Sequence, residues 1–156
     1  MVFIGIDQST TNTGIVVINE EQEIIEFELV KDKTKDIIDR SLIMIEKVKG
    51  KIGQYRPEDC KVCVEGISFF SKGRIDKLAM LLGGIFYGLK AEGYEVGLVP
   101  PNSLKQSFTG SGKAKKEDML ASCPKEILEL FKGKEKKIDD LVDAYALACY
   151  CKSAAM

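Results

Sequence analysis

The first thirty residues contain three successive runs with strand character, and this order limits the fold classes open to the chain. Residues 2–7 form a short apolar run typical of a buried central strand, and the run ends on Asp7. Residues 14–18 are rich in β-branched side chains, and residues 23–30 follow a polar turn at 19–21, as in a hairpin. The chain therefore begins with three strands.

Helical and strand patterns alternate through the rest of the chain. We expect strands at 61–67 and 94–99, and helices at 36–55, 74–92, 103–108, 116–121, 126–131 and from 139 almost to the C-terminus. This order of elements, βββαβαβα, predicts an α/β fold in which a five-stranded mixed sheet is flanked by helices. A length of 156 residues fits one domain over 1–156.

The composition indicates a soluble protein of the cytoplasm. The sequence contains no apolar stretch of about 20 residues and no basic start of a signal peptide, so we expect no membrane association. Five cysteines fit free thiols in a reducing compartment. Cys60 and Cys63 have a metal-ligand spacing, but the chain has no histidine and a closed zinc site needs four convergent ligands. We therefore interpret the cysteines as buried apolar residues.

Two carboxylates stand at the ends of strands that are expected to be buried. Asp7 ends the first strand, and Glu65 follows three apolar residues of the fourth. Either one alone could be an ordinary surface acid. Two such acids favour a bound cation or a raised pKa, because an unpaired buried carboxylate is costly.

The last helix adds one acid that needs a partner. Asp143 is the only charged residue between positions 141 and 151, and Asp140 lies one turn before it, on the same side. Asp139 and Asp140 could instead cap the helix, where its dipole favours negative charge. Capping leaves Asp143 unexplained.

Carboxylate ligands suit Mg²⁺, with Mn²⁺ as a substitute, better than softer metals. Two ions about 3.5–4 Å apart can activate a water and stabilise a leaving 3′ oxygen. In this hypothesis Asp7 bridges both ions, Glu65 completes one site, and Asp140 with Asp143 completes the other. The net charge of −1 argues against a polyanionic partner, but two divalent ions would reverse its sign, and residues 105–137 hold nine lysines against five acids.

Three segments together resemble the RuvC family of Holliday junction resolvases, which belongs to the RNase H-like superfamily. These segments are residues 5–14 (GIDQSTTNTG), 64–66 (VEG) and 138–148 (IDDLVDAYALA), and their order and spacing match over nearly the whole chain. The resemblance implies an RNase H-like fold, a homodimer and symmetric nicks across a four-way junction during DNA recombination or repair. It implies that the catalytic metal ligands are Asp7, Glu65, Asp140 and Asp143. Some family members have histidine in place of Asp140.

The resemblance also implies DNA-binding residues. Lys105 and Lys116 fall at positions that carry basic residues near DNA in the family, and Lys113 and Lys115 lie in the same segment. A solvated lysine-rich loop is the alternative. The family places an aromatic residue near the junction centre. The alignment puts Ser68 at that position, and the adjacent candidates are Phe69 and Phe70, either of which could instead be buried.

The segment 79–89 contains three glycines, at positions 83, 84 and 88, within an expected helix. Glycine costs about 1 kcal/mol within a helix, so three of them suggest close approach by another backbone. We interpret this as a dimer contact, with packing onto the chain's own sheet as the alternative.

Two other functions remain open from the sequence. The first motif also resembles the phosphate loop of sugar kinases, actin and chaperone ATPases, although those enzymes need two such lobes and this chain has room for one. The second alternative is a non-catalytic module that binds branched DNA. The sequence leaves open strict four-way-junction selectivity, base preference, protein partners and the choice between Asp139 and Asp140.

Overall fold

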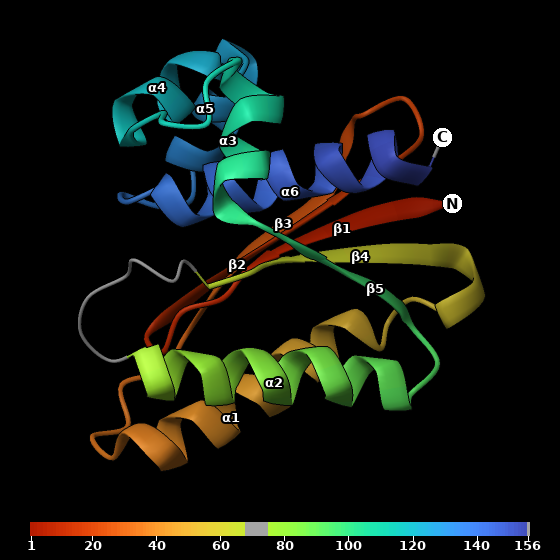
Figure 1. The fold of residues 1–156 in the computed structure, drawn as a ribbon, viewed down its shortest axis with the longest axis vertical. Coiled ribbons are helices and arrows are strands. Elements are labelled where there is room, and N and C mark those ends of the chain that lie inside the picture. Colours follow the sequence, from red (N-terminus) through yellow and green to blue (C-terminus); the bar gives the residue numbers. More distant parts are fainter. Residues whose placement is uncertain (68–74, 156) are drawn as a thin grey trace.

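The computed structural model describes residues 1–67 and 75–155, and it contains one five-stranded sheet (Figure 1). The sheet has the order β3-β2-β1-β4-β5. Strand β2 is antiparallel to both of its neighbours, while β4 is parallel to β1 and to β5. The carboxyl ends of β1 and β4 therefore lie side by side at one end of the sheet. The strands are β1 (Val2–Asp7), β2 (Asn12–Ile18), β3 (Ile24–Lys31), β4 (Cys60–Glu65) and β5 (Glu95–Val99).

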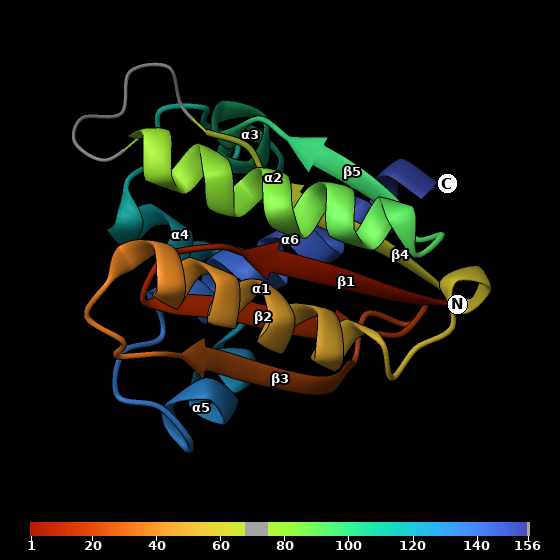
Figure 2. The same cartoon turned by 90° about the horizontal axis from the view of Figure 1, so that it is seen from below.

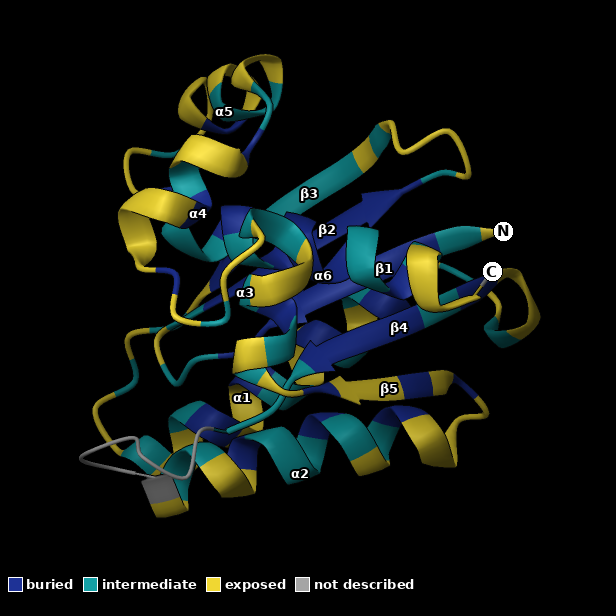
Figure 3. Cartoon of the chain, turned by 45° about the horizontal axis from the view of Figure 1, so that its top comes forward, coloured by how far each residue is buried: buried dark blue, intermediate teal, exposed yellow. Residues whose placement is uncertain are grey.

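Helices cover both faces of this sheet (Figures 1 and 2). One face carries α1 (Ile37–Ile52) and α2 (Ile75–Ala91). The other face carries α6 (Asp139–Ala155), and three shorter helices lie over it: α3 (Pro101–Thr109), α4 (Lys116–Ser122) and α5 (Lys125–Lys132). The alternating side chains of the strands form two apolar cores, one under each helical layer. Figure 3 shows the central strands β1, β2 and β4 as mostly buried.

Helix α6 lies unusually close to the sheet, because glycines face it from two strands. A Cβ atom at Gly5 of β1 would collide with the carbonyl oxygen of Ala144, and one at Gly14 of β2 would collide with that of Asp140. Alanines on the facing side of the helix, Ala144 and Ala148, complete this contact. The close packing fixes the height of the first turns of α6 above the end of β1.

The predicted order of elements and the mixed sheet are confirmed, with small differences at the boundaries. The fourth strand ends at Glu65 rather than at 67, and a short 3₁₀ turn (Pro57–Asp59) precedes it. Helix α3 begins at Pro101, because proline suits the first turn of a helix. Phe69 and Phe70 lie outside the described residues. No helix in the described ranges is long and apolar enough to span a bilayer.

The structure places two of the three glycines in α2 against side chains of the same chain. A Cβ atom at Gly84 would overlap the side chain of Ile45 in α1, and one at Gly88 would press on Lys49 of the same helix. Gly83 faces open space. Two of these glycines thus allow α1 to pack against α2 within one chain, and neither a second copy nor the chain's own sheet is needed to explain them.

Candidate active site

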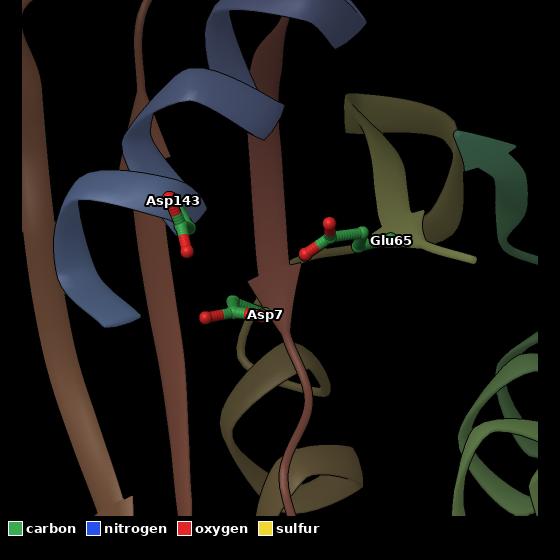
Figure 4. Close-up of side chains that lie close together, drawn as sticks. All are labelled: Asp7, Glu65 and Asp143. Carbon is green, nitrogen blue, oxygen red and sulfur yellow. The ribbon is translucent and has the colours of Figure 1, made fainter. Parts of the chain in front are cut away.

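Three carboxylates from separate elements converge where β1 and β4 end (Figure 4). Asp7 is the last residue of β1, Glu65 is the last residue of β4, and Asp143 lies in the second turn of α6. One oxygen from each lies within 4.8 Å of the others. The side chains point toward one another in Figure 4, so the fold gathers residues that are far apart in the sequence.

Burial makes this cluster electrostatically costly. Asp7 is only 9% exposed, and desolvation, followed by repulsion from Glu65 and Asp143, raises its pKa well above the usual range. Burial also raises the pKa of Glu65, against the opposing effects of a hydrogen bond with Asp7 and of nearby Lys105. Burial and the other acids raise the pKa of Asp143 to about 7. The burial of three carboxylates together therefore favours a neutralising cation at this place.

The two adjacent acids at the start of α6 have different surroundings. Asp139 forms an ion pair with Lys116 at 2.9 Å between Oδ2 and Nζ. Asp140 stands outside the cluster of three, but its carboxyl is close enough to that of Asp7 to help raise the pKa of Asp7. The structure thus directs Asp140 toward the cluster and Asp139 toward a lysine.

Lysines border the same cluster. A cavity of about 260 Å³ is lined by Glu65 and Asp143 and, facing them, by Lys105, Lys115 and Lys116. Lys105 is close enough to lower the pKa of both acids, against the dominant effect of burial. The fourth predicted lysine, Lys113, is exposed and does not line this cavity. The site therefore pairs a carboxylate cluster with cationic side chains that suit a phosphate group.

The donor set fits a hard divalent ion. Every convergent group in the cluster is a carboxylate oxygen, the type of ligand taken by Mg²⁺ and Mn²⁺, and the chain has no histidine. The raised pKa values of Asp7 and Asp143 also favour a bound divalent ion, because its charge would offset the repulsion between these acids. The arrangement can hold metal next to a phosphodiester.

Comparison with known proteins agrees with this chemistry. A family model described as "Crossover junction endodeoxyribonuclease RuvC" matches residues 3–151. This chain belongs to the RuvC family. The RuvC protein of Aliarcobacter butzleri is 30% identical over 152 residues, which cover 95% of this chain and 96% of that protein.

Solved structures of RuvC proteins share the fold. Thermus thermophilus RuvC has a TM-score of 0.75 and 26% identity, covering 100% of this chain and 96% of that one. The same protein in complex with a Holliday junction substrate has a TM-score of 0.72 and 25% identity, covering 99% of this chain and 96% of that chain. The fowlpox virus Holliday junction resolvase, at 19% identity and a TM-score of 0.63 over 99% of both chains, has the same fold.

These matches confirm three predictions: the RuvC family, the RNase H-like fold and the class of enzyme, a crossover junction endodeoxyribonuclease. They also remove the sugar-kinase alternative for the first motif, because the family match includes that motif. The metal dependence of a RuvC-type nuclease agrees with the acidic cluster.

Two residues near the site were missed in the sequence, where residues 8–12 read only as a polar turn. The Gln8 amide donates from Nε2 to the carbonyl oxygen of Glu65 at 2.9 Å. Arg40 of α1 donates from Nε to the carbonyl oxygen of Thr10 at 2.6 Å and from Nη1 to that of Thr34 at 3.1 Å. Arg40 thus connects the loop after Asp7 to the loop before α1. No local sequence signal marks the contacts with Glu65 and Thr10, because these partners are distant in sequence.

Proposed function

We propose that this RuvC-family chain nicks four-way DNA junctions by metal-assisted hydrolysis of phosphodiesters, in DNA recombination or repair. The observation that carries the proposal is the convergence of Asp7, Glu65 and Asp143 beside a lysine-lined cavity. The bound Holliday junction in the structure of a relative with the same fold supports the substrate class. We also propose that the enzyme acts in the cytoplasm of a bacterial or phage-infected cell, where its free cysteines stay reduced.

The carboxylates would hold two Mg²⁺ ions, for which Mn²⁺ would substitute. Such ions supply an activated water and stabilise the leaving 3′ oxygen. The Asp7 carboxylate lies within 4.8 Å of those of Glu65 and Asp143, so Asp7 would serve both ions, Glu65 would complete one site, and Asp143 the other. Asp140 would join Asp143, because its carboxyl helps raise the pKa of Asp7 whereas that of Asp139 is held by Lys116.

Lysines would position the DNA backbone. Lys105, Lys115 and Lys116 face the acids across the cavity and would each bind a phosphate, which gives affinity without base preference. Lys116 would exchange its ion pair with Asp139 for a phosphate, and that pair is largely exposed on the lysine side. Lys113 would contact DNA farther from the cut.

The direct test offers end-labelled four-way junction, fork and plain duplex to the protein with Mg²⁺ and maps the nicks. We expect paired symmetric nicks on the four-way junction only. Equal cutting of forks would indicate a broader branched-DNA nuclease. Asp7→Asn should abolish cutting and keep junction binding. If Asp7→Asn cuts at the wild-type rate, the proposed site is wrong, and if the wild type only binds junctions, the chain is a non-catalytic module.

Paired cuts require two active sites, and one chain supplies one, so we also propose a homodimer. The outer face of α2 presents Met80, which is 56% exposed, and Tyr87, which is 71% exposed, with Gly83 between them. Leu42 of the neighbouring helix α1 is also exposed. Large apolar side chains gathered on one helical layer suit a partner surface.

Sedimentation tests the dimer. Met80→Glu combined with Tyr87→Glu should shift the protein from dimer to monomer at micromolar concentration and should abolish paired nicking. Leu130→Glu is the matched control, because Leu130 is 47% exposed on α5, over the opposite face of the sheet. A wild-type protein that sediments as a monomer would contradict this part of the proposal.

A further inference from the structure

The strands that carry Asp7 and Glu65 are not paired with each other at their last residues. The parallel ladder between β1 and β4 ends at the pair Ile6 and Val64, one residue before each acid. Asp7 is held instead by its pairing with Gly14 of β2, and Glu65 by its pairing with Val99 of β5. No β1–β4 backbone pair therefore joins the two acids directly at the proposed metal centre.

The side chain of Gln8 connects the two strand ends beyond this ladder. Its amide nitrogen donates to the carbonyl oxygen of Glu65 at 2.9 Å. Gln8 directly follows Asp7 and is only 8% exposed, so the bond joins the main chains beside both acids in a buried place. A hydrogen bond that is shielded from water is electrostatically stronger than an exposed one.

The amide oxygen of Gln8 indicates that the stability of the fold alone does not explain a glutamine at this position. Its Oε1 atom is buried and accepts no hydrogen bond from the described residues. An unsatisfied buried acceptor destabilises the folded state, whereas methionine would fill a similar volume without that cost. Within the described parts of the chain, the amide forms its hydrogen bond with the carbonyl oxygen of Glu65, so this bond is the contact that a methionine would lose.

From these observations we propose that Gln8 is a positioning residue for the metal centre: its amide fixes the spacing between Asp7 and Glu65 and thereby sets the affinity for divalent ions. The inference rests on the proposed function, because it needs metal at these carboxylates. Residues that orient metal ligands without touching the metal typically change metal affinity by about 10–100-fold when they are replaced.

The test measures Mn²⁺ binding to the full chain by electron paramagnetic resonance, together with the melting temperature of the metal-free protein. Gln8→Met should raise the Mn²⁺ concentration at half-saturation by about 10-fold or more. Its metal-free melting temperature should stay within about 4 °C of the wild type, because the lost bond is compensated by removal of the unsatisfied oxygen. Gln8→Asn, which keeps an amide but is too short to span the same gap, should also weaken Mn²⁺ binding.

Gln106→Met is the matched control. Gln106 also donates its amide to a backbone carbonyl at 2.9 Å, that of Gly110, but it joins no strand that carries an acid. Its Mn²⁺ midpoint should equal that of the wild type. Titrations are run at a temperature at which circular dichroism shows each variant folded. A folded Gln8→Met protein with the wild-type midpoint would overturn the role of Gln8, whereas a wild-type protein that binds no Mn²⁺ would overturn the metal centre itself.

Discussion

The two faces of the sheet are packed in different ways, and the difference separates chemistry from assembly. On one face α6 lies against glycines of β1 and β2, close enough that its acids reach the end of β1. On the other face α1 and α2 cover the strands with larger aliphatic side chains, contribute no acid to the cluster and expose Met80 and Tyr87 outward. The close backbone contact of α6 positions its acids at the site, whereas the layer of α1 and α2 presents an exposed apolar surface.

After the loss of Asp7, the largest expected effect comes from the acids at the start of α6. Asp140→Asn should lower the rate of junction cutting about 100-fold or more, equivalent to ~2.7 kcal/mol, because it removes an acid that acts electrostatically on Asp7. Asp139→Asn should retain most of the activity, since that side chain is paired with Lys116. Single-turnover cutting measures both rates. Equal losses in the two variants would contradict the assignment of Asp140.

The contrast between the two faces is tested by adding one methyl group to each. Gly5→Ala should lower the free energy of unfolding by about 3 kcal/mol, because the new Cβ collides with the backbone of α6. Gly83→Ala on the other face meets open space and should raise it by up to ~1 kcal/mol through helix propensity. Urea unfolding measures both changes. A neutral Gly5→Ala would show that α6 does not need its close approach.

The acids should make the metal-free protein less stable as pH rises. Asp143 has a folded pKa of about 7, above its unfolded value of about 3.9, so the folded state binds the proton more tightly. This stabilisation is complete below about pH 4 and is lost as pH rises through 7. At pH 8 with a chelator, Asp143→Asn should therefore raise the free energy of unfolding by ~1–2 kcal/mol.

Urea unfolding from pH 4 to 8 checks this pH dependence. The exposed Asp76 on α2 gives a control, since Asp76→Asn should change the free energy of unfolding by less than about 0.5 kcal/mol at every pH. The gain in Asp143→Asn should fade toward pH 4, and a gain independent of pH would rule out this electrostatic cause.

The smallest effect concerns the lysines of the cavity. Lys105→Ala should weaken junction binding several-fold and reduce the slope of log affinity against log salt by about 1, as expected for one lost phosphate contact. Lys152 lies near the far end of α6, so Lys152→Ala should leave the slope unchanged. Fluorescence anisotropy between 50 and 200 mM salt, roughly the range in which such slopes are read, measures the change.

The fold and most of the candidate site follow from sequence periodicity and from the placement of acids. Asp7 and Glu65 were predicted because apolar strands end on them, and Asp143 because no other charge stands in its part of the helix. Asp140 could not be separated from Asp139, because the choice depends on which one meets Lys116, and that contact crosses about twenty residues of chain.

Contacts between distant segments also could not be predicted from the sequence. Gln8 belongs to a turn motif by composition, and only the parallel pairing of β1 with β4 brings it to the carbonyl of Glu65. The glycines of α2 suggested an approaching backbone, but the partner is the side chain of Ile45 in the same chain. In both cases the local composition indicated a polar or closely packed position but did not predict which residue it contacts.

The most direct measurement of the proposed centre is the number of Mn²⁺ ions bound per chain, in the wild type and in Asp7→Asn. Asp7 is buried and its carboxylate lies within 4.8 Å of those of Glu65 and Asp143, so its amide variant should lose both ions. We expect two ions per wild-type chain and none bound tightly in Asp7→Asn, with circular dichroism showing both proteins folded. Two ions retained by Asp7→Asn would contradict a metal centre built around the end of β1.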